Sequence, residues 1–255
     1  MVSQLKKNIF NTTWEFQLLK PIETPIFTLR DYQSQAVKEV ESQWMDQIRR
    51  VVMIAPTGSG KGTMIGQMVR DAILRGQRVI VVVTMLSLIP QAVGDCWDFG
   101  LRGNIGVVCG SFPKQANPNA PIQIVTLQTL QNCQYKNNFL SDADLVIFDE
   151  FHTSGFYEQA TAILTEWHCW IAAFTATPYD KSFGLSEKHG GISRADGVVF
   201  CPDYLSLQKM GFLVPLSYST LSLEVGKNKR DLNSDEGIRY VFETFLQSEG
   251  VQREG

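Results

Sequence analysis

The sequence lacks the features that mark several large classes of protein. It contains no apolar run of the roughly 18 residues that a membrane span requires, and no apolar stretch of signal-peptide length follows Lys6 and Lys7. Its 5 cysteines are spread along the chain, which argues against a disulfide framework or a CxxC zinc site. The net charge of −3 argues against a strongly basic protein that coats nucleic acid non-specifically, although it allows a local groove that binds nucleic acid. We therefore expect a reduced protein of the cytoplasm.

The composition itself is that of an ordinary globular chain. Of the 255 residues, 44% are hydrophobic and 19% are charged, which excludes a disordered, collagen-like or coiled-coil protein. At roughly 150 residues per domain, this length predicts one large domain, or one domain with additional pieces. Four of the tryptophans are expected in the core rather than as base-stacking platforms: Trp44, Trp97, Trp167 and Trp170.

Short apolar runs alternate with amphipathic segments along most of the chain. Strands are predicted at residues 50–55, 78–84, 105–109, 122–127, 145–148, 171–175 and 216–223. Helices are predicted at residues 29–44, 63–74, 87–99, 157–167 and 204–210. Most of these strands are apolar throughout rather than alternating, which indicates a mostly parallel sheet with helices on both faces. The predicted fold class is a doubly wound α/β domain.

We expect this domain to cover residues 28–225. Residues 1–27 are predicted to be an N-terminal arm, and residues 181–197 are predicted to be a loop. Residues 226–255 combine a polar linker with a last helix that Ser234 would cap. The apolar face of that helix either folds back on the core or meets another domain.

A glycine-rich segment, APTGSGKGT at residues 55–63, lies between a predicted strand and a predicted helix. This context is typical of a phosphate-binding loop, because glycines let backbone N–H groups point at an anion and the helix N-terminus adds positive partial charge. Lys61 can then reach the β- and γ-phosphates of a nucleotide. The alternative is an ordinary glycine-rich turn. The candidate nucleotide-binding residues here are Pro56, Thr57, Gly58, Ser59, Gly60, Lys61, Gly62 and Thr63.

A second segment, LVIFDE at residues 145–150, is a predicted buried strand that ends in two carboxylates. In an open α/β sheet, ligands bind at the carboxyl edge of the strands. Asp149 can hold Mg²⁺, directly or through water, and Glu150 can orient and deprotonate an attacking water. The alternative, for this segment alone, is that the two carboxylates simply lie in solvent at the end of the strand. Together with residues 55–63, it predicts a site that hydrolyses a nucleotide.

These motifs, in this order, resemble the first RecA-like domain of superfamily 2 helicases and nucleic-acid translocases over about residues 28–218. The subgroup that they most resemble is the DEAH-type DNA helicases of phages and bacteria. LRDYQ at residues 29–33 is similar to the adenine-reading segment, which implies that Gln33 and Arg30 contact the base. DEFH at residues 149–152 matches the DEAH box. The resemblance thus implies four catalytic residues: Lys61, Asp149, Glu150 and His152.

Further segments extend the resemblance. TATP at residues 175–178 is similar to motif III, which implies that Thr175 and Thr177 couple hydrolysis to movement. The resemblance also implies that three residues face a nucleic-acid strand: Gln91, Thr126 and Gln128. GFLVP at residues 211–215 resembles the exit from the first domain. ATP and Mg²⁺ are the implied cofactors, and nucleic acid, DNA rather than RNA, is the implied partner.

The sequence departs from the family at two positions near these motifs. Gly62 stands where the family has a Thr or Ser whose hydroxyl ligates Mg²⁺, and Thr63 would face elsewhere on the helix, so we expect a weakened metal site. The same loop resembles that of adenylate kinases, but a nucleoside kinase has no use for a DE-x-H strand end followed by TATP. Met85 stands where relatives often carry an arginine beside the nucleic-acid backbone.

The family also needs a second RecA-like domain, which supplies arginine fingers. Residues 226–255 are too few to hold one, so the domain is expected in trans or in a longer parent chain. Alone, the chain is expected to bind nucleotide but hydrolyse it slowly, because a missing arginine finger costs on the order of 10³–10⁵ in rate. The alternative is a non-catalytic nucleotide- or DNA-binding module that regulates a full helicase.

Overall fold

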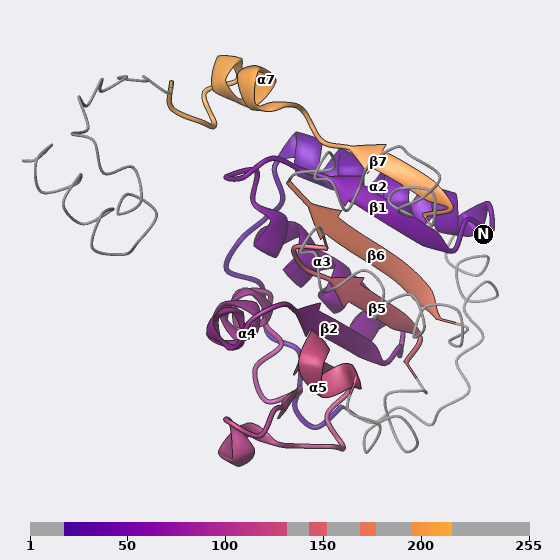
Figure 1. Ribbon diagram of the computed structural model, residues 1–255, viewed down its shortest axis with the longest axis vertical. Coiled ribbons are helices and arrows are strands. Elements are labelled where there is room, and N and C mark those ends of the chain that lie inside the picture. The colour runs from indigo at the N-terminus through magenta and orange to yellow at the C-terminus, as the bar shows by residue number, and fades with distance from the viewer. Residues whose placement is uncertain (1–17, 132–142, 152–168, 177–194, 216–255) are drawn as a thin grey trace, which may run out of the picture. The chain divides into compact units, whose positions relative to one another are not determined.

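The computed structural model of the chain, shown in Figure 1, describes residues 18–131, 143–151, 169–176 and 195–215. The chain divides into two compact units, Met1–Val214 and Pro215–Gly255, and the fold below is that of the first. Several predicted features lie outside the described residues: the helix at 157–167, most of the loop at 181–197, the strand at 216–223, the C-terminal helix, His152 and Thr177.

One sheet of 7 strands forms the centre of the domain, in the order β3-β4-β2-β5-β6-β1-β7. All neighbouring strands pair in parallel. The strands are β1 (Arg50–Ile54), β2 (Val79–Val83), β3 (Ile105–Val108), β4 (Ile122–Thr126), β5 (Leu145–Phe148), β6 (Trp170–Thr175) and β7 (Gly197–Phe200). The helices are α2 (Asp31–Met45), α3 (Lys61–Leu74), α4 (Ile89–Asp98), α5 (Leu127–Gln131) and α7 (Tyr204–Lys209), with short 3₁₀ turns at Leu86–Leu88 and Pro113–Gln115. The predicted α/β fold is confirmed.

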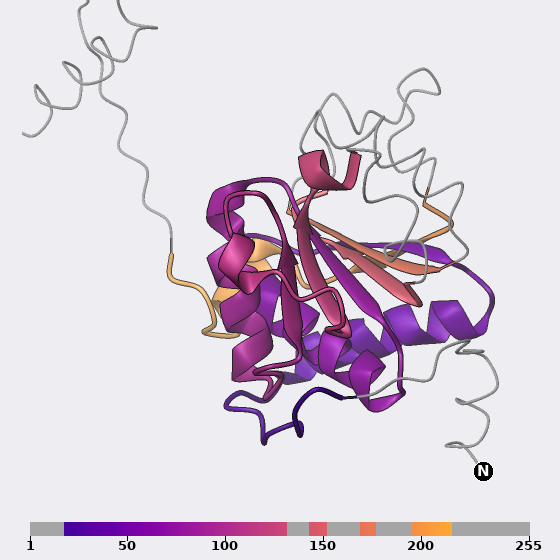
Figure 2. The same cartoon turned by 90° about the horizontal axis from the view of Figure 1, so that it is seen from below.

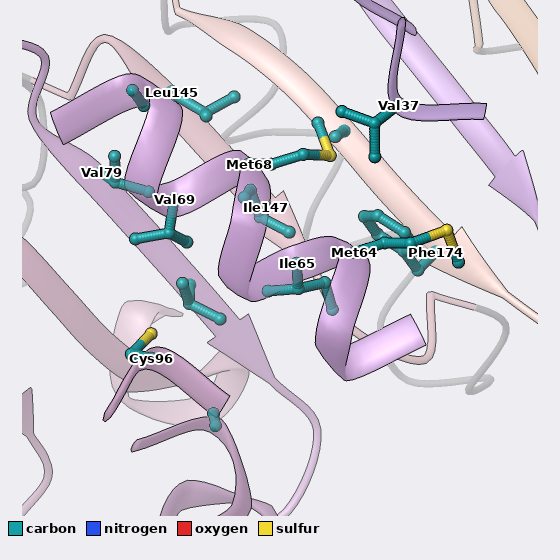
Figure 3. Packing of buried hydrophobic residues seen from close by; sticks show 14 of the residues in the cluster. Val37, Met64, Ile65, Met68, Val69, Val79, Cys96, Leu145, Ile147 and Phe174 are labelled. Carbon is teal, nitrogen blue, oxygen red and sulfur yellow. The ribbon is translucent and has the colours of Figure 1, made fainter. Parts of the chain in front are cut away.

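Two hydrophobic clusters, one on each face, explain why the strands are apolar throughout. In β2, Val79, Val81 and Val83 belong to the cluster under α2, α3 and α4. Ile80 and Val82 belong to the other cluster, which includes residues of α5. Figure 2 shows the indigo and purple helices together on one side of the sheet, and Figure 3 shows the packing of α3 on the strands beneath it. An apolar residue is therefore needed at every position of the central strands.

Helix α3 packs on the sheet through one apolar face. Its buried face is formed by Met64, Ile65, Gly66, Met68, Val69, Ala72 and Ile73. The helix begins at Lys61, two residues before the predicted start, and is followed by Gly76, whose φ of +75° suits glycine at a helix end. The N–H of Gly76 donates to the carbonyl of Ile73 at 3.0 Å.

Two local features differ from the prediction. Strand β7 was not predicted: its apolar run is short and directly follows the segment predicted as a loop, and at this edge of the sheet only Val199 of the strand is buried. Trp44 is buried in the core as expected, and the partly buried Trp170 packs against it, with ring centroids 6.2 Å apart. The prediction that Trp97 lies in the core is wrong: its side chain is 44% exposed, and the Arg102 guanidinium lies 5.1 Å from its ring centroid.

Part of the predicted N-terminal arm packs on the turn after α4. The N–H groups of Leu19 and Lys20 both donate to Asn104 Oδ1 at 3.0 Å, and Glu23 N–H donates to the carbonyl of Gly100 at 2.9 Å. None of the helices in the described ranges has the length and hydropathy that would let it cross a lipid bilayer.

Candidate nucleotide-binding site

The carboxyl ends of the parallel strands bring the predicted motifs to one edge of the sheet. The glycine-rich loop follows β1, and Asp149 and Glu150 follow β5. Strand β6 lies between these two strands and ends at Thr175. Because the carboxyl edge of a doubly wound sheet is where ligands bind, this edge is the candidate site.

The loop has the backbone geometry expected of a phosphate-binding turn. Gly58 has φ of +82° and Gly60 has φ of +79°, a region that residues with a Cβ rarely adopt. Ser59 N–H donates to the carbonyl of Pro56 at 3.1 Å, and α3 begins directly after Gly60. Ser59 is fully buried, and its Oγ has no hydrogen-bond partner among the described residues. The loop thus leads into a helix N-terminus, where an anion is favoured.

Lys61 of this loop forms an ion pair with the strand end. Its Nζ lies 3.2 Å from Glu150 Oε1, with the two side chains 11% and 30% exposed. Glu150 has φ of +53°, an unfavourable backbone conformation for a residue with a side chain. The flanking residues hold it there: Asp149 N–H donates to Val82 in β2, and Phe151 N–H donates to Phe174 in β6. Pairing on both sides of β5 therefore fixes the position from which Glu150 meets the lysine.

The predicted adenine-reading segment is attached to the same loop. Gln33 Nε2 and the Tyr32 hydroxyl each donate to the carbonyl of Ser59 at 2.8 Å. Gln33 Oε1 accepts the backbone N–H of Arg30 at 2.9 Å. The structure therefore brings Gln33 to the loop, where its amide bonds to protein backbone, and contact with a base stays a prediction.

Phe212 and Leu213 also lie at the loop, although sequence reasoning assigned them only to the exit from the domain. The Phe212 ring lies 5.3 Å from that of Tyr32, and the Arg30 guanidinium lies 4.4 Å from the centroid of Phe212. A Cβ at Gly58 would come within 2.7 Å of Leu213 Cδ2. No local pattern signals this packing, because the contact joins residues far apart in the sequence.

Asp95 of α4 was also missed, and it faces the unusual glycine of the loop. A Cβ at Gly62 would overlap the Asp95 carboxylate, with Cγ 2.7 Å and Oδ1 2.8 Å away. Thr63 Oγ1 lies instead 3.5 Å from the Cβ position of Gly60. Burial, together with the nearby Asp149 and Asp98 carboxylates, raises the pKa of Asp95 from 3.8 to about 6. Position 62 therefore has no room for a threonine while Asp95 keeps its place.

The remaining predicted site residues are dispersed. Thr175 is fully buried, and its carbonyl accepts the N–H of Ala55 at 2.9 Å. Gln91 and Gln128 are exposed, on α4 and α5 respectively. The hydroxyl of Thr126 lies 2.9 Å from that of Thr129 and accepts the Thr129 N–H at 3.3 Å, as a cap of α5. Their roles in coupling and in nucleic-acid contact stay predictions.

The carboxylates at this edge of the sheet are suited to Mg²⁺ that binds together with a nucleotide. Asp149 and Glu150 follow β5, and a third carboxylate, that of Asp95, lies beside Gly62. Among the described residues, no three His, Cys, Asp or Glu side chains are arranged to hold a metal by themselves. Mg²⁺ is commonly bound through one or two carboxylates together with phosphates and water, so the residues present fit this ion.

The seven-stranded parallel sheet with helices, and a glycine-rich loop after its first strand, has the α/β RecA-like fold. The chain belongs to the ResIII family of superfamily 2 helicase-type domains, described as "Type III restriction enzyme, res subunit", which matches residues 26–180. A comparison with curated protein sequences finds no significant match.

Solved structures share the fold at low sequence identity. The UvsW helicase from bacteriophage T4 is 17% identical with a TM-score of 0.54, covering 78% of this chain and 67% of that one. The Hef helicase domain of Pyrococcus furiosus is 17% identical with a TM-score of 0.55, covering 71% and 39%. The SWI2/SNF2 ATPase core of Sulfolobus solfataricus, in complex with dsDNA, is 19% identical with a TM-score of 0.51, covering 69% and 37%. The chain thus spans between 37% and 67% of the length of these proteins.

Proposed function

We propose that this chain is the ATP-binding half of a DEAH-type DNA helicase or translocase, which couples ATP hydrolysis to movement on DNA. The observation that carries the proposal is the 3.2 Å ion pair between Lys61 and Glu150. This ion pair joins the phosphate-binding loop to the carboxylate that would orient and deprotonate the attacking water. Membership of the ResIII family supports the same reaction class.

Each residue of the site has a role that its chemistry supports. The backbone of residues 57–62 and the Lys61 ammonium would bind the phosphates, and Gln33 and Arg30 would read the adenine. Asp149 would hold Mg²⁺ through water, and Glu150 would orient the attacking water and accept its proton. When bound, Mg²⁺ supplies positive charge that stabilises the phosphates during transfer. The phosphate of a bound nucleotide would compete with Glu150 for Lys61. Glu150 would then be free to contact the attacking water.

The proposed helicase or translocase includes a second RecA-like domain, either in trans or in a longer parent chain, and acts in the cytoplasm. Arginine fingers from that domain would complete the site, so the isolated chain would hydrolyse ATP slowly. DNA is preferred over RNA as the partner because one of the structures that share this fold is an ATPase core in complex with dsDNA.

The decisive experiment is a titration of the chain with ATP, with and without Mg²⁺. Wild type is expected to bind, with tighter binding in Mg²⁺, and Lys61→Ala is expected to lose at least tenfold in affinity, or about 1.4 kcal/mol. Lys209→Ala, at the end of α7, is the control for loss of a positive charge. Absence of binding in a folded wild-type chain would contradict the proposal.

A second candidate is a non-catalytic nucleotide- or DNA-binding module, and Gly62 is the observation that favours it, since the position lacks the metal-binding hydroxyl. Such a module would show neither Mg²⁺-dependent nucleotide binding nor turnover stimulated by nucleic acid when a second domain is added. The two candidates therefore differ in two measurable properties.

A further inference from the structure

Position 62 of the loop is filled from a neighbouring helix. The three atoms nearest to a Cβ built on Gly62 are Oδ2, Cγ and Oδ1 of Asp95, and the last two lie 2.7 Å and 2.8 Å away. A carboxylate oxygen therefore occupies the space into which a side chain at position 62 would extend. Hydroxyl and carboxylate oxygens are both ligands that Mg²⁺ accepts.

The close approach of two helices places Asp95 there. One helical turn after Gly62, a Cβ on Gly66 would come within 2.5 Å of Phe99 Cδ2 and within 2.9 Å of the Asp95 carbonyl. The two glycines thus give α3 a flat face on which α4 packs. Asp95 is half-buried at this contact, and its neighbours Asp149 and Asp98 lie near enough to act on its charge.

We propose that Asp95 replaces the missing hydroxyl at position 62, and that its carboxylate, together with Asp149, would supply the oxygens that hold the Mg²⁺ of a bound nucleotide. This inference rests on the proposed function, namely that the loop binds a magnesium nucleotide. Gly62 and Asp95 are then a matched pair, in which the glycine makes room for the carboxylate. A metal ion beside Asp95 and Asp149 would also relieve the repulsion between two like charges.

A purely structural role makes a different prediction. If Gly62 serves only to let α4 pack on α3, then removing the charge of Asp95 while keeping its shape leaves metal-dependent binding unchanged. Asp95→Asn is such a change. Asp98→Asn is the matched control, because Asp98 lies on the same helix and is not among the atoms nearest to position 62.

The experiment uses the full chain and measures ADP affinity with Mg²⁺ and with EDTA, and Mn²⁺ binding in the presence of ADP by electron paramagnetic resonance. Asp95→Asn is expected to lose roughly 10- to 100-fold in metal affinity, while ADP affinity in EDTA stays within about twofold. Asp98→Asn is expected to lose clearly less metal affinity than Asp95→Asn, because Asp98 acts on Asp95 only through its charge. Equal Mn²⁺ affinity in wild type and Asp95→Asn would overturn the inference.

A double variant keeps the test decisive if Asp95→Asn fails to fold. In Gly62→Ser with Asp95→Ala, the removed carboxylate makes room for a hydroxyl at position 62, so Mn²⁺ binding with ADP is expected to return. Gly62→Ser alone is expected to lower the unfolding temperature because of the overlap with Asp95. A folded double variant without metal-dependent binding would overturn the inference. A folded wild type that binds no nucleotide would instead overturn the proposed function.

Discussion

Lys61, the first residue of α3, and Glu150, two residues beyond the end of β5, lie 3.2 Å apart although 89 positions separate their numbers. The pair connects the phosphate-binding loop to the acidic strand end across β6. Because both side chains are largely removed from water, at 11% and 30% exposure, their attraction is screened less than that of a surface pair.

Glu150→Gln is expected to separate nucleotide binding from hydrolysis. The variant removes the charge that holds Lys61, so ATP affinity should stay equal or rise, as measured by titration. Hydrolysis in the presence of a second RecA-like domain should fall on the order of 10²–10⁴-fold, because the proton acceptor is lost. Glu41→Gln, which breaks the 2.8 Å pair with Arg75 far from the loop, is the control. A parallel loss of both properties would argue against a role for Glu150 in the chemical step.

Gly60→Ala is expected to abolish nucleotide binding. The backbone at Gly60 has φ of +79°, and an added Cβ would overlap the Gln33 amide. Gly76→Ala is a matched control, since its φ is +75° and nothing lies within 4 Å of the added Cβ. Both changes carry a backbone cost of roughly 1–2 kcal/mol in unfolding free energy. Urea unfolding should therefore show the larger loss for Gly60→Ala, and a loss of binding in Gly76→Ala would contradict the steric explanation.

The pair between Arg50 and Asp196 predicts a pH-dependent contribution to stability. The two residues join β1 to the start of β7 through bonds of 3.0 Å and 2.7 Å. The hydrogen bond from Arg50 holds the pKa of Asp196 below its usual 3.8. Because the folded pKa is the lower one, the stabilisation is present above about pH 4 and is lost as the pH falls through the folded pKa.

Asp196→Asn should accordingly lower the free energy of unfolding at pH 7 by no more than about 1 kcal/mol, since the pair is partly exposed. The difference from wild type should shrink in urea titrations at pH 3. Asp46→Asn, at the end of α2, is a control outside this pair. An equal difference at both pH values would contradict the assignment of the effect to the Asp196 charge.

Met85→Arg is expected to strengthen binding to DNA. Met85 follows β2 at the carboxyl edge, its side chain is 58% exposed, and the resemblance to superfamily 2 helicases implies an arginine there. One added phosphate contact should steepen the dependence of log affinity on log salt by about one unit. Met210→Arg, at a site 54% exposed after α7, adds the same charge elsewhere. Equal slopes for the two variants would indicate a general effect of charge.

Much of the fold could be predicted from local pattern. The predicted strands at residues 50–55, 78–84, 105–109, 122–127, 145–148 and 171–175 correspond to β1–β6 with bounds shifted by no more than one residue at either end. The glycines at positions 58 and 60 marked the loop, and both have positive φ. A parallel sheet then brings the ends of its strands to one edge, so the meeting of the loop with the acidic strand end also followed from sequence.

The tertiary structure alone decided the features that depend on pairs of distant residues. Strand β7 is fixed by its pairing with β1, in which Val199 lies opposite Met53, because its short apolar run alone was too weak a signal to predict a strand. Trp97 is exposed because the buried face of α4 is formed by Ile89, Ala92 and Cys96. Asp95 meets Gly62 because two glycines let α4 approach α3. Periodicity along the chain records which face of an element is apolar, but it does not record which distant residue packs against that face.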